Sequence, residues 1–190
     1  MKKLVVASNN AGKLREIREI LKDKYEVVSM GELGYNEDIV EDGQTFYENA
    51  LIKAKTVSEA LGCDALADDS GRCVEALNGD PGVYSARYAG GHGDDKANRD
   101  LLLKNLEGKE NRKAKFVSSI VLYKTDGTII EGVGETFGTI GFTEEGTNGF
   151  GYDCIFISDD LGVSFGLASQ EDKNKVSHRY RGLVDLLRRL

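Results

Sequence analysis

Short apolar runs alternate with amphipathic stretches at the start of the chain. Leu4 to Ala7 is an apolar run that predicts a strand, and Leu14, Ile17 and Leu21 recur after it at helical spacing. Glu26 to Ser29 predicts a second strand. The order strand, turn, helix, strand is typical of an α/β protein.

The clearest helical pattern follows a polar, acidic segment, residues 30–42, which predicts a loop. Thr45 followed three residues later by Glu48 resembles a capping box, and Gly62 is typical of a helix C-terminus. We therefore expect one helix between Thr45 and Gly62. Its apolar stripe consists of Phe46, Ala50, Ala54, Val57 and Leu61.

The rest of the chain predicts further strands and helices. Ala65 to Ala67 predicts a short strand that ends at Asp68-Asp69-Ser70-Gly71, and the Gly-rich residues 72–93 predict a structured loop region with short strands. Further along we expect a helix at 94–106, strands at 114–123, 128–137 and 155–157 with an Asp-Gly hairpin turn at 126–127, and a final helix with Tyr180, Leu183, Leu187 and Leu190 on one stripe. Without an internal repeat or linker, one domain over residues 1–190 is expected.

Composition excludes several classes of protein. The 25 basic and 32 acidic residues give a net charge of -7, which argues against a protein that coats nucleic acid. The three cysteines lack CxxC spacing, so neither a zinc site nor a disulfide framework is expected. The first apolar run ends at Ala7, too short for a signal peptide, and no stretch approaches the roughly 20 apolar residues of a membrane span. We expect a soluble, cytoplasmic protein that binds neither nucleic acid nor membranes.

The first candidate site is Ser8-Asn9-Asn10-Ala11-Gly12-Lys13, between the first strand and helix. Backbone N–H groups and the helix dipole favour a phosphate at such a turn, and Lys13 adds a positive charge. It is not a Walker P-loop, because Leu14 stands where Ser or Thr would hold magnesium. A helix cap with a surface lysine is the alternative.

The second candidate is a set of carboxylates, Glu41, Glu48, Asp68 and Asp69, at predicted turns or helix starts. Mg²⁺ takes oxygen ligands, often one or two carboxylates plus substrate phosphates. A carboxylate near such a metal can also deprotonate a water molecule. Solvated surface acids are the alternative for each residue taken alone.

Two segments are candidates for recognition of a base. In Gly149-Phe150-Gly151-Tyr152-Asp153 the glycines permit close approach to a flat ligand, and Phe150 can stack on a base. Lys173 and Ser177-His178-Arg179 supply donors near the start of the last helix, which suit the keto oxygen of a 6-oxo purine. A β-turn with core aromatics and a basic helix start without a ligand are the respective alternatives.

Together these segments resemble the inosine triphosphate pyrophosphatase family, also called the dITP/XTP pyrophosphatases. The resemblance rests on ASNNAGK, EDGQTFYENALIKA, ADDSG, DPGVYSARYAG, GFGYD and SHR, in the family's order. It implies an α/β fold with a long, mixed, twisted sheet flanked by helices and two lobes that enclose a central cleft. The implied reaction is hydrolysis of ITP, dITP or XTP to the monophosphate and pyrophosphate. Mg²⁺ is the implied cofactor, with Mn²⁺ as an alternative, and a homodimer is the usual assembly.

The resemblance also implies roles for individual residues. Glu41 and Asp69 bind the metal, and Asp69 is also the base that activates water. The substrate-binding residues are Ser8, Asn9, Asn10, Ala11, Gly12, Lys13, Ser70, Phe150, Gly151, Tyr152, Asp153, Lys173, His178 and Arg179. The chain departs from the family's usual pattern at Arg72, Cys154 and Tyr180, which leaves substrate preference open but not the reaction class.

Two other functions share part of this pattern. A pyrophosphatase acting on modified pyrimidine nucleotides would keep the phosphate chemistry and differ at the base-binding segments. A non-catalytic nucleotide sensor would keep Lys13 but would not need Asp69 or Glu41. The presence of both acidic residues favours the enzyme.

Overall fold

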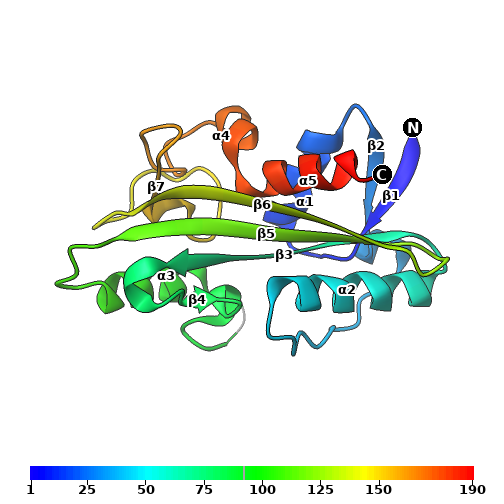
Figure 1. Cartoon of the computed structure of the whole chain (residues 1–190), viewed down its shortest axis with the longest axis horizontal. Coiled ribbons are helices and arrows are strands. Elements are labelled where there is room, and N and C mark those ends of the chain that lie inside the picture. Colours follow the sequence, from blue (N-terminus) through cyan, green and yellow to red (C-terminus); the bar gives the residue numbers. More distant parts are fainter. Residues whose placement is uncertain (92) are drawn as a thin grey trace. The chain divides into compact units, whose positions relative to one another are not determined.

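The computed structural model describes residues 1–91 and 93–190, and Figure 1 shows their helices and strands. The strands form a mixed sheet in the order β2-β1-β3-β5-β6-β7, with β4 beside β3. Strand β1 is parallel to both β2 and β3, whereas β4 is antiparallel to β3 and β7 is antiparallel to β6. This arrangement confirms the predicted mixed α/β sheet flanked by helices. The strands are β1 (Lys2–Val6), β2 (Tyr25–Ser29), β3 (Ala65–Val74), β4 (Pro81–Gly82), β5 (Lys113–Tyr123), β6 (Ile129–Ile140) and β7 (Phe156–Ser158). The helices are α1 (Ala11–Leu21), α2 (Phe46–Leu61), α3 (Asp95–Asn105), α4 (Gln170–Val176) and α5 (His178–Arg188).

The chain divides into two compact units. The first unit comprises residues 1–69, 118–134 and 179–190, and the second comprises 70–117 and 135–178. The boundaries fall inside β3, β5 and β6. Two units agree with the two lobes that the resemblance implies, and the single domain over residues 1–190 stays a prediction.

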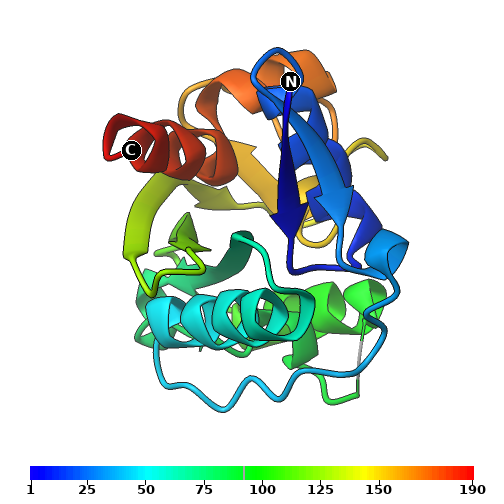
Figure 2. The same ribbon diagram turned by 90° about the vertical axis from the view of Figure 1, so that its right-hand side faces the viewer.

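In the first unit, helices cover both faces of the sheet, with α1 and α5 on one face and α2 on the other (Figures 1 and 2). Alternation along β1 sends Leu4 and Val6 into a cluster with α1 and α5, and sends Val5 and Ala7 into a cluster with α2. Both clusters consist of fully or nearly fully buried apolar side chains. The strands of this unit are therefore apolar on both faces, which explains their continuous apolar runs.

Helix α2 begins and ends at the predicted residues. The Thr45 hydroxyl accepts the N–H of Glu48 at 3.1 Å, which satisfies one of the free donors of the first turn. Gly62 adopts a left-handed conformation, with φ of 65°, and its N–H closes the last turn on the carbonyl of Ser58. The predicted cap and stop are both confirmed.

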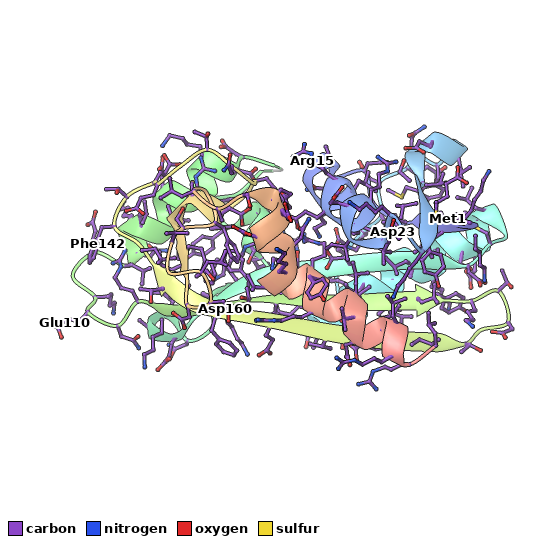
Figure 3. All side chains as sticks on the ribbon, turned by 90° about the horizontal axis from the view of Figure 1, so that it is seen from above. Met1, Arg15, Asp23, Glu110, Phe142 and Asp160 are labelled. Carbon is purple, nitrogen blue, oxygen red and sulfur yellow. The ribbon has the colours of Figure 1, made fainter. Side chains whose placement is uncertain are left out.

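The second unit has an aromatic core of its own. The rings of Phe116 and Phe156 stack with centroids 3.9 Å apart, and Phe165 packs against both. Helix α3 adds Leu102 and Leu106 to this core. Phe142, labelled in Figure 3, lies outside this core: it is 79% exposed, and its ring contacts the guanidinium of Arg112.

Strand β3 corrects one prediction. We expected a strand that ends at Ala67 and a turn at Asp68 and Asp69, but β3 continues to Val74. Its second half pairs antiparallel with β4, where Arg72 lies opposite Gly82. This pairing places the polar segment within the sheet, so its polar composition does not end the strand. Asp68 and Asp69 are therefore buried strand residues.

Two other predictions concern the hairpin and the membrane. The β5–β6 turn is confirmed, because Gly127 has φ of 89° and Lys124 donates its N–H to the carbonyl of Thr128. Among residues 1–91 and 93–190, no helix combines the length and the apolar character needed to cross a bilayer.

Candidate active site

The segment between β1 and α1 forms a capped helix N-terminus. Asn10 is the N-cap, and its side chain accepts the N–H of Lys13 at 3.0 Å. The Ser8 hydroxyl accepts the N–H of Asn10 at 3.1 Å. The positive end of the helix dipole and the first-turn amides make this end of α1 suited to a phosphate. The candidate residues in or beside this turn are Ser8, Asn9, Asn10, Ala11, Gly12 and Lys13.

Two lysines meet at one backbone carbonyl of β3. The ammonium groups of Lys13 and Lys53 lie 3.1 and 2.8 Å from the carbonyl oxygen of Asp68. Burial lowers the pKa of Lys13 to about 8; Asp68 opposes this shift, while Lys53 and Arg179 add to it. Two neighbouring cations with little water attract an anion, because an anion relieves their repulsion and replaces lost solvation.

Lys53 also brings two predicted metal ligands to one point. Its ammonium lies 3.0 Å from Oε1 of Glu41 and 3.6 Å from Oδ1 of Asp69. Glu41 belongs to the loop before α2, which is fixed where Gly43 donates its N–H to the Asn49 side chain at 2.8 Å. The two carboxylates therefore converge on a single cation.

Asp69 combines burial with basicity. Its side-chain Oδ2 is buried and accepts no hydrogen bond from the part of the chain that the structure describes. Burial raises the pKa of Asp69 to about 6, and Glu41 adds to this rise while Lys53 and Lys13 oppose it. The carboxylate is thus ionised at neutral pH yet basic enough to take a proton from water.

Asp68 and Arg179 belong to a buried ionic group. Nε of Arg179 donates to Oδ2 of Asp68 at 2.7 Å, and its Nη1 donates to Oε1 of Glu16. Burial favours the neutral form of each group, but their mutual attraction prevails. It raises the pKa of Arg179 above its usual range and holds the pKa of Asp68 well below its own. Arg179 is 0% exposed, and its predicted role as a base reader stays a prediction.

In the second unit, Asp153 and Lys173 form a buried ion pair. Nζ of Lys173 lies 2.6 Å from Oδ2 of Asp153, and the same oxygen accepts the N–H of Phe150 at 2.9 Å. The ammonium also lies 4.9 Å from the centroid of the Phe150 ring. A Cβ at Gly149 would come within 2.1 Å of Oδ2 of Asp153, so only glycine fits there. The structure thus brings Phe150, Asp153 and Lys173 together.

The remaining candidates of the second unit are Tyr152, His178, Gly151 and Ser70. The Tyr152 hydroxyl donates to the carbonyl of Ser85 at 2.6 Å, and burial raises the pKa of Tyr152 above its usual range. The His178 ring is fully buried and meets Phe116 edge-on, with centroids 5.3 Å apart. Gly151 contributes its carbonyl to a contact with α3. Ser70 follows Asp69 directly in β3.

The residues present fit a hard divalent cation. Among the described residues, no group of three His, Cys, Asp or Glu side chains could hold a metal. Mg²⁺ needs fewer, since it commonly binds one or two carboxylates plus substrate phosphates. Glu41 and Asp69 supply those two carboxylates, and Oδ2 of Asp69 has a free lone pair.

Sequence reasoning missed both Lys53 and Glu16. Lys53 lies in the motif EDGQTFYENALIKA, one helical turn after Asn49, so both face the same side of α2. That spacing was the available signal for Lys53. The burial of Glu16 in α1, at 1% exposed, follows only from the partner that β3 and α5 provide.

Fold and cluster together define a mixed α/β protein that gathers buried lysines and carboxylates beside a capped helix N-terminus. The chain belongs to the Ham1 family, whose model matches residues 4–189.

Curated relatives and solved structures match nearly the whole chain. The dITP/XTP pyrophosphatase of Haemophilus influenzae is 48% identical and covers 99% of this chain and 98% of its own length. The dITP/XTP pyrophosphatase of Streptomyces coelicolor is 43% identical, and the match covers 100% of this chain and 99% of that protein. The structure of the Staphylococcus aureus Ham1 protein superposes with a TM-score of 0.85 at 41% identity over 96% of this chain and 95% of its own. The nucleoside-triphosphatase, or dITP/XTP pyrophosphatase, of Mycobacterium abscessus does so with a TM-score of 0.77 at 42% identity, over 97% and 98%.

Proposed function

We propose that this protein is a nucleoside triphosphate pyrophosphatase that hydrolyses deaminated purine nucleoside triphosphates, namely ITP, dITP and XTP. The products are the nucleoside monophosphate and pyrophosphate, so the reaction removes damaged nucleotides from the pool. The observation that carries the proposal is the convergence of Lys13, Lys53 and Asp69 at the middle of β3, beside the start of α1. The names of the relatives support the same reaction.

The residues of the first unit supply the hydrolytic chemistry. The amides at the start of α1 and the ammonium of Lys13 bind the phosphates. Asp69 orients a water molecule and accepts its proton as the water oxygen attacks the α-phosphorus. The bond from that phosphorus to the bridging oxygen breaks, and pyrophosphate leaves with the bond's electron pair. Electrostatic positioning supplies most of the acceleration, as in phosphoryl transfer generally.

Glu41 and Asp69 are the residues that would hold Mg²⁺, with Mn²⁺ as an alternative. The bound ion would neutralise charge on the triphosphate. Without the ion, Lys53, which contacts both carboxylates, would offset their mutual repulsion.

The choice of base comes from residues of the second unit together with Arg179 of the first. Phe150 stacks on the purine, and the pair of Asp153 and Lys173 fixes the loop that carries it. Donors from Lys173, His178 and Arg179 read the keto oxygen at position 6, where adenine presents an amino group. Ser70, Gly151 and Tyr152 complete the proposed substrate contacts.

We propose that the enzyme is a homodimer in the cytoplasm. The resemblance to the inosine triphosphate pyrophosphatases supports the dimer. Cys63, Cys73 and Cys154 are free thiols, as in a reducing compartment. Light scattering after size exclusion tests the assembly, and a monomer at micromolar concentration rejects it.

Release of pyrophosphate with Mg²⁺, measured across ITP, XTP, dITP, ATP, GTP and dUTP, tests the function. We expect kcat/KM for the first three to exceed the others by at least about 10², since a site of fixed donors rejects a base with the wrong group. Preference for dUTP would indicate a pyrimidine enzyme, and no release from any nucleotide would indicate a binding protein.

A further inference from the structure

The loop that carries Phe150 to Asp153 contains several glycines in the left-handed region. Gly146, Gly149 and Gly151 all have positive φ, at 84°, 70° and 61°. Glycine loses more conformational entropy on ordering than any other residue. Backbone hydrogen bonds hold part of the loop, from the N–H of Glu145 to the carbonyl of Cys154 and from the N–H of Asn148 to that of Gly166, and a side chain of α3 adds a further contact.

Arg99 of α3 contacts this loop at both ends. Its Nε donates to Oε1 of Glu144, and its Nη1 donates to the carbonyl of Gly151 at 2.8 Å. The side chain of Arg99 is only 16% exposed. One guanidinium thus closes the loop from Glu144 to Gly151, in surroundings less hydrated than a surface ion pair.

Helix α3 holds the backbone of Arg99 in place. The helix begins at the N-cap Asp94, whose side chain accepts the N–H of Ala97 at 3.0 Å. Leu102 is fully buried in the aromatic core of the second unit. Asn98, next to Arg99, donates to the carbonyl of Ala86 at 3.1 Å, which ties α3 to the short 3-10 helix Ser85–Arg87.

We propose that Arg99 is a positioning residue for base recognition, an inference that rests on the proposed function. The planar guanidinium fixes the direction of the Gly151 carbonyl, because its N–H groups diverge at set angles. That carbonyl belongs to the peptide group that joins Gly151 to Tyr152, between Phe150 and Asp153. Arg99 therefore sets the angle at which Phe150 is presented to the purine. The hydrolytic cluster of the first unit does not depend on it.

Steady-state kinetics of Arg99→Ala and Arg99→Lys test this role. We expect Arg99→Ala to raise KM for ITP about tenfold, as expected for loss of a charged hydrogen bond, with kcat within about twofold of wild type. The ITP/ATP ratio of kcat/KM falls in parallel. Arg99→Lys restores part of the loss, since Lys donates to one acceptor but lacks the fork. Lys104→Ala, an exposed change on the same helix, leaves KM unchanged.

A purely structural role predicts a different result. Partial unfolding lowers the active fraction and hence the apparent kcat, but it leaves KM and the ITP/ATP ratio at their wild-type values. Wild-type KM in Arg99→Ala therefore overturns the assignment, and so does a loss confined to kcat.

Hydrogen exchange keeps the test independent of the reaction. We expect the amides of residues 144–152 to exchange faster in Arg99→Ala than in wild type or Lys104→Ala, with α3 unchanged. Unchanged exchange in the loop overturns the tether. Absence of pyrophosphate release by wild type would reject the proposed function, while the exchange result would still decide whether Arg99 holds the loop.

Discussion

The charged cluster of the first unit and the base loop of the second are built on different supports. Lys13, Lys53 and Asp69 stand on α1, α2 and the interior of β3. Phe150 stands on a loop with several positive-φ glycines, which backbone hydrogen bonds and side-chain contacts hold together. Groups on regular elements keep their geometry, whereas a tethered loop can adjust to its ligand. Changes in the cluster should therefore affect the chemical step, and changes in the loop should affect the choice of substrate.

Asp69→Asn should give the largest effect. The amide cannot accept the water proton, so we expect kcat to fall about 10³-fold, within the range for loss of a general base. KM should change little, because the variant has nearly the same size. A rate near that of wild type would reject Asp69 as the base.

The same variant should be more stable than wild type without metal. Because the pKa of Asp69 rises from 3.8 to about 6 on folding, its ionisation costs stability as the pH rises through that window. We expect Asp69→Asn to gain about 1–3 kcal/mol at pH 7.5 and almost none at pH 4. Thermal unfolding at both pH values measures this gain, and an equal gain at both would contradict the buried, raised pKa.

Lys53→Met should lower kcat/KM about 10²-fold, comparable with removal of one stabilising donor. It removes the ammonium that joins Glu41, Asp69 and the Asp68 carbonyl. Lys55→Met, an exposed change on the same helix, is the matched control. Equal effects of the two changes on pyrophosphate release would show that Lys53 acts only through net charge.

Phe150→Ala should have a smaller effect of a different kind. Loss of stacking should raise KM for ITP about tenfold and leave kcat nearly unchanged. Phe142→Ala removes an exposed ring outside the loop of the same unit and should change neither constant. A fall in kcat as large as that of Asp69→Asn would erase the distinction between the two regions.

The pH dependence of kcat/KM should show two ionisations of the charged cluster, that of Asp69 and that of Lys13. We expect kcat/KM to rise through about pH 6 as Asp69 ionises and to fall above about pH 8 as Lys13 loses its proton. Bound phosphate favours protonated Lys13, so the alkaline limb of kcat should lie at higher pH than that of kcat/KM. Coincident alkaline limbs would mean that Lys13 does not contact the substrate.

Local signals in the sequence predicted much of this fold. The cap at Thr45, the stop at Gly62 and the hairpin at Gly127 are properties of a few neighbouring residues, and the structure confirms each. The length of β3 was predicted wrongly, because its second half forms through pairing with β4. Polar composition alone pointed to a turn there.

Only those residues of the candidate site that lie in recognisable motifs were predictable from the sequence. Lys13, Glu41 and Asp69 lie in quoted motifs, and the structure brings them together around Lys53. The contacts of Arg179 with Asp68 and Glu16 join three distant segments. Such partners depend on tertiary structure, so no spacing in the sequence reveals them.

Hydrolysis of ITP in ¹⁸O-labelled water tests the proposed chemistry most directly. A water molecule activated by Asp69 attacks the α-phosphorus, so the label should appear in inosine monophosphate, with unlabelled pyrophosphate as the other product. Label in pyrophosphate, or release of inorganic phosphate with the diphosphate, would contradict the proposed reaction.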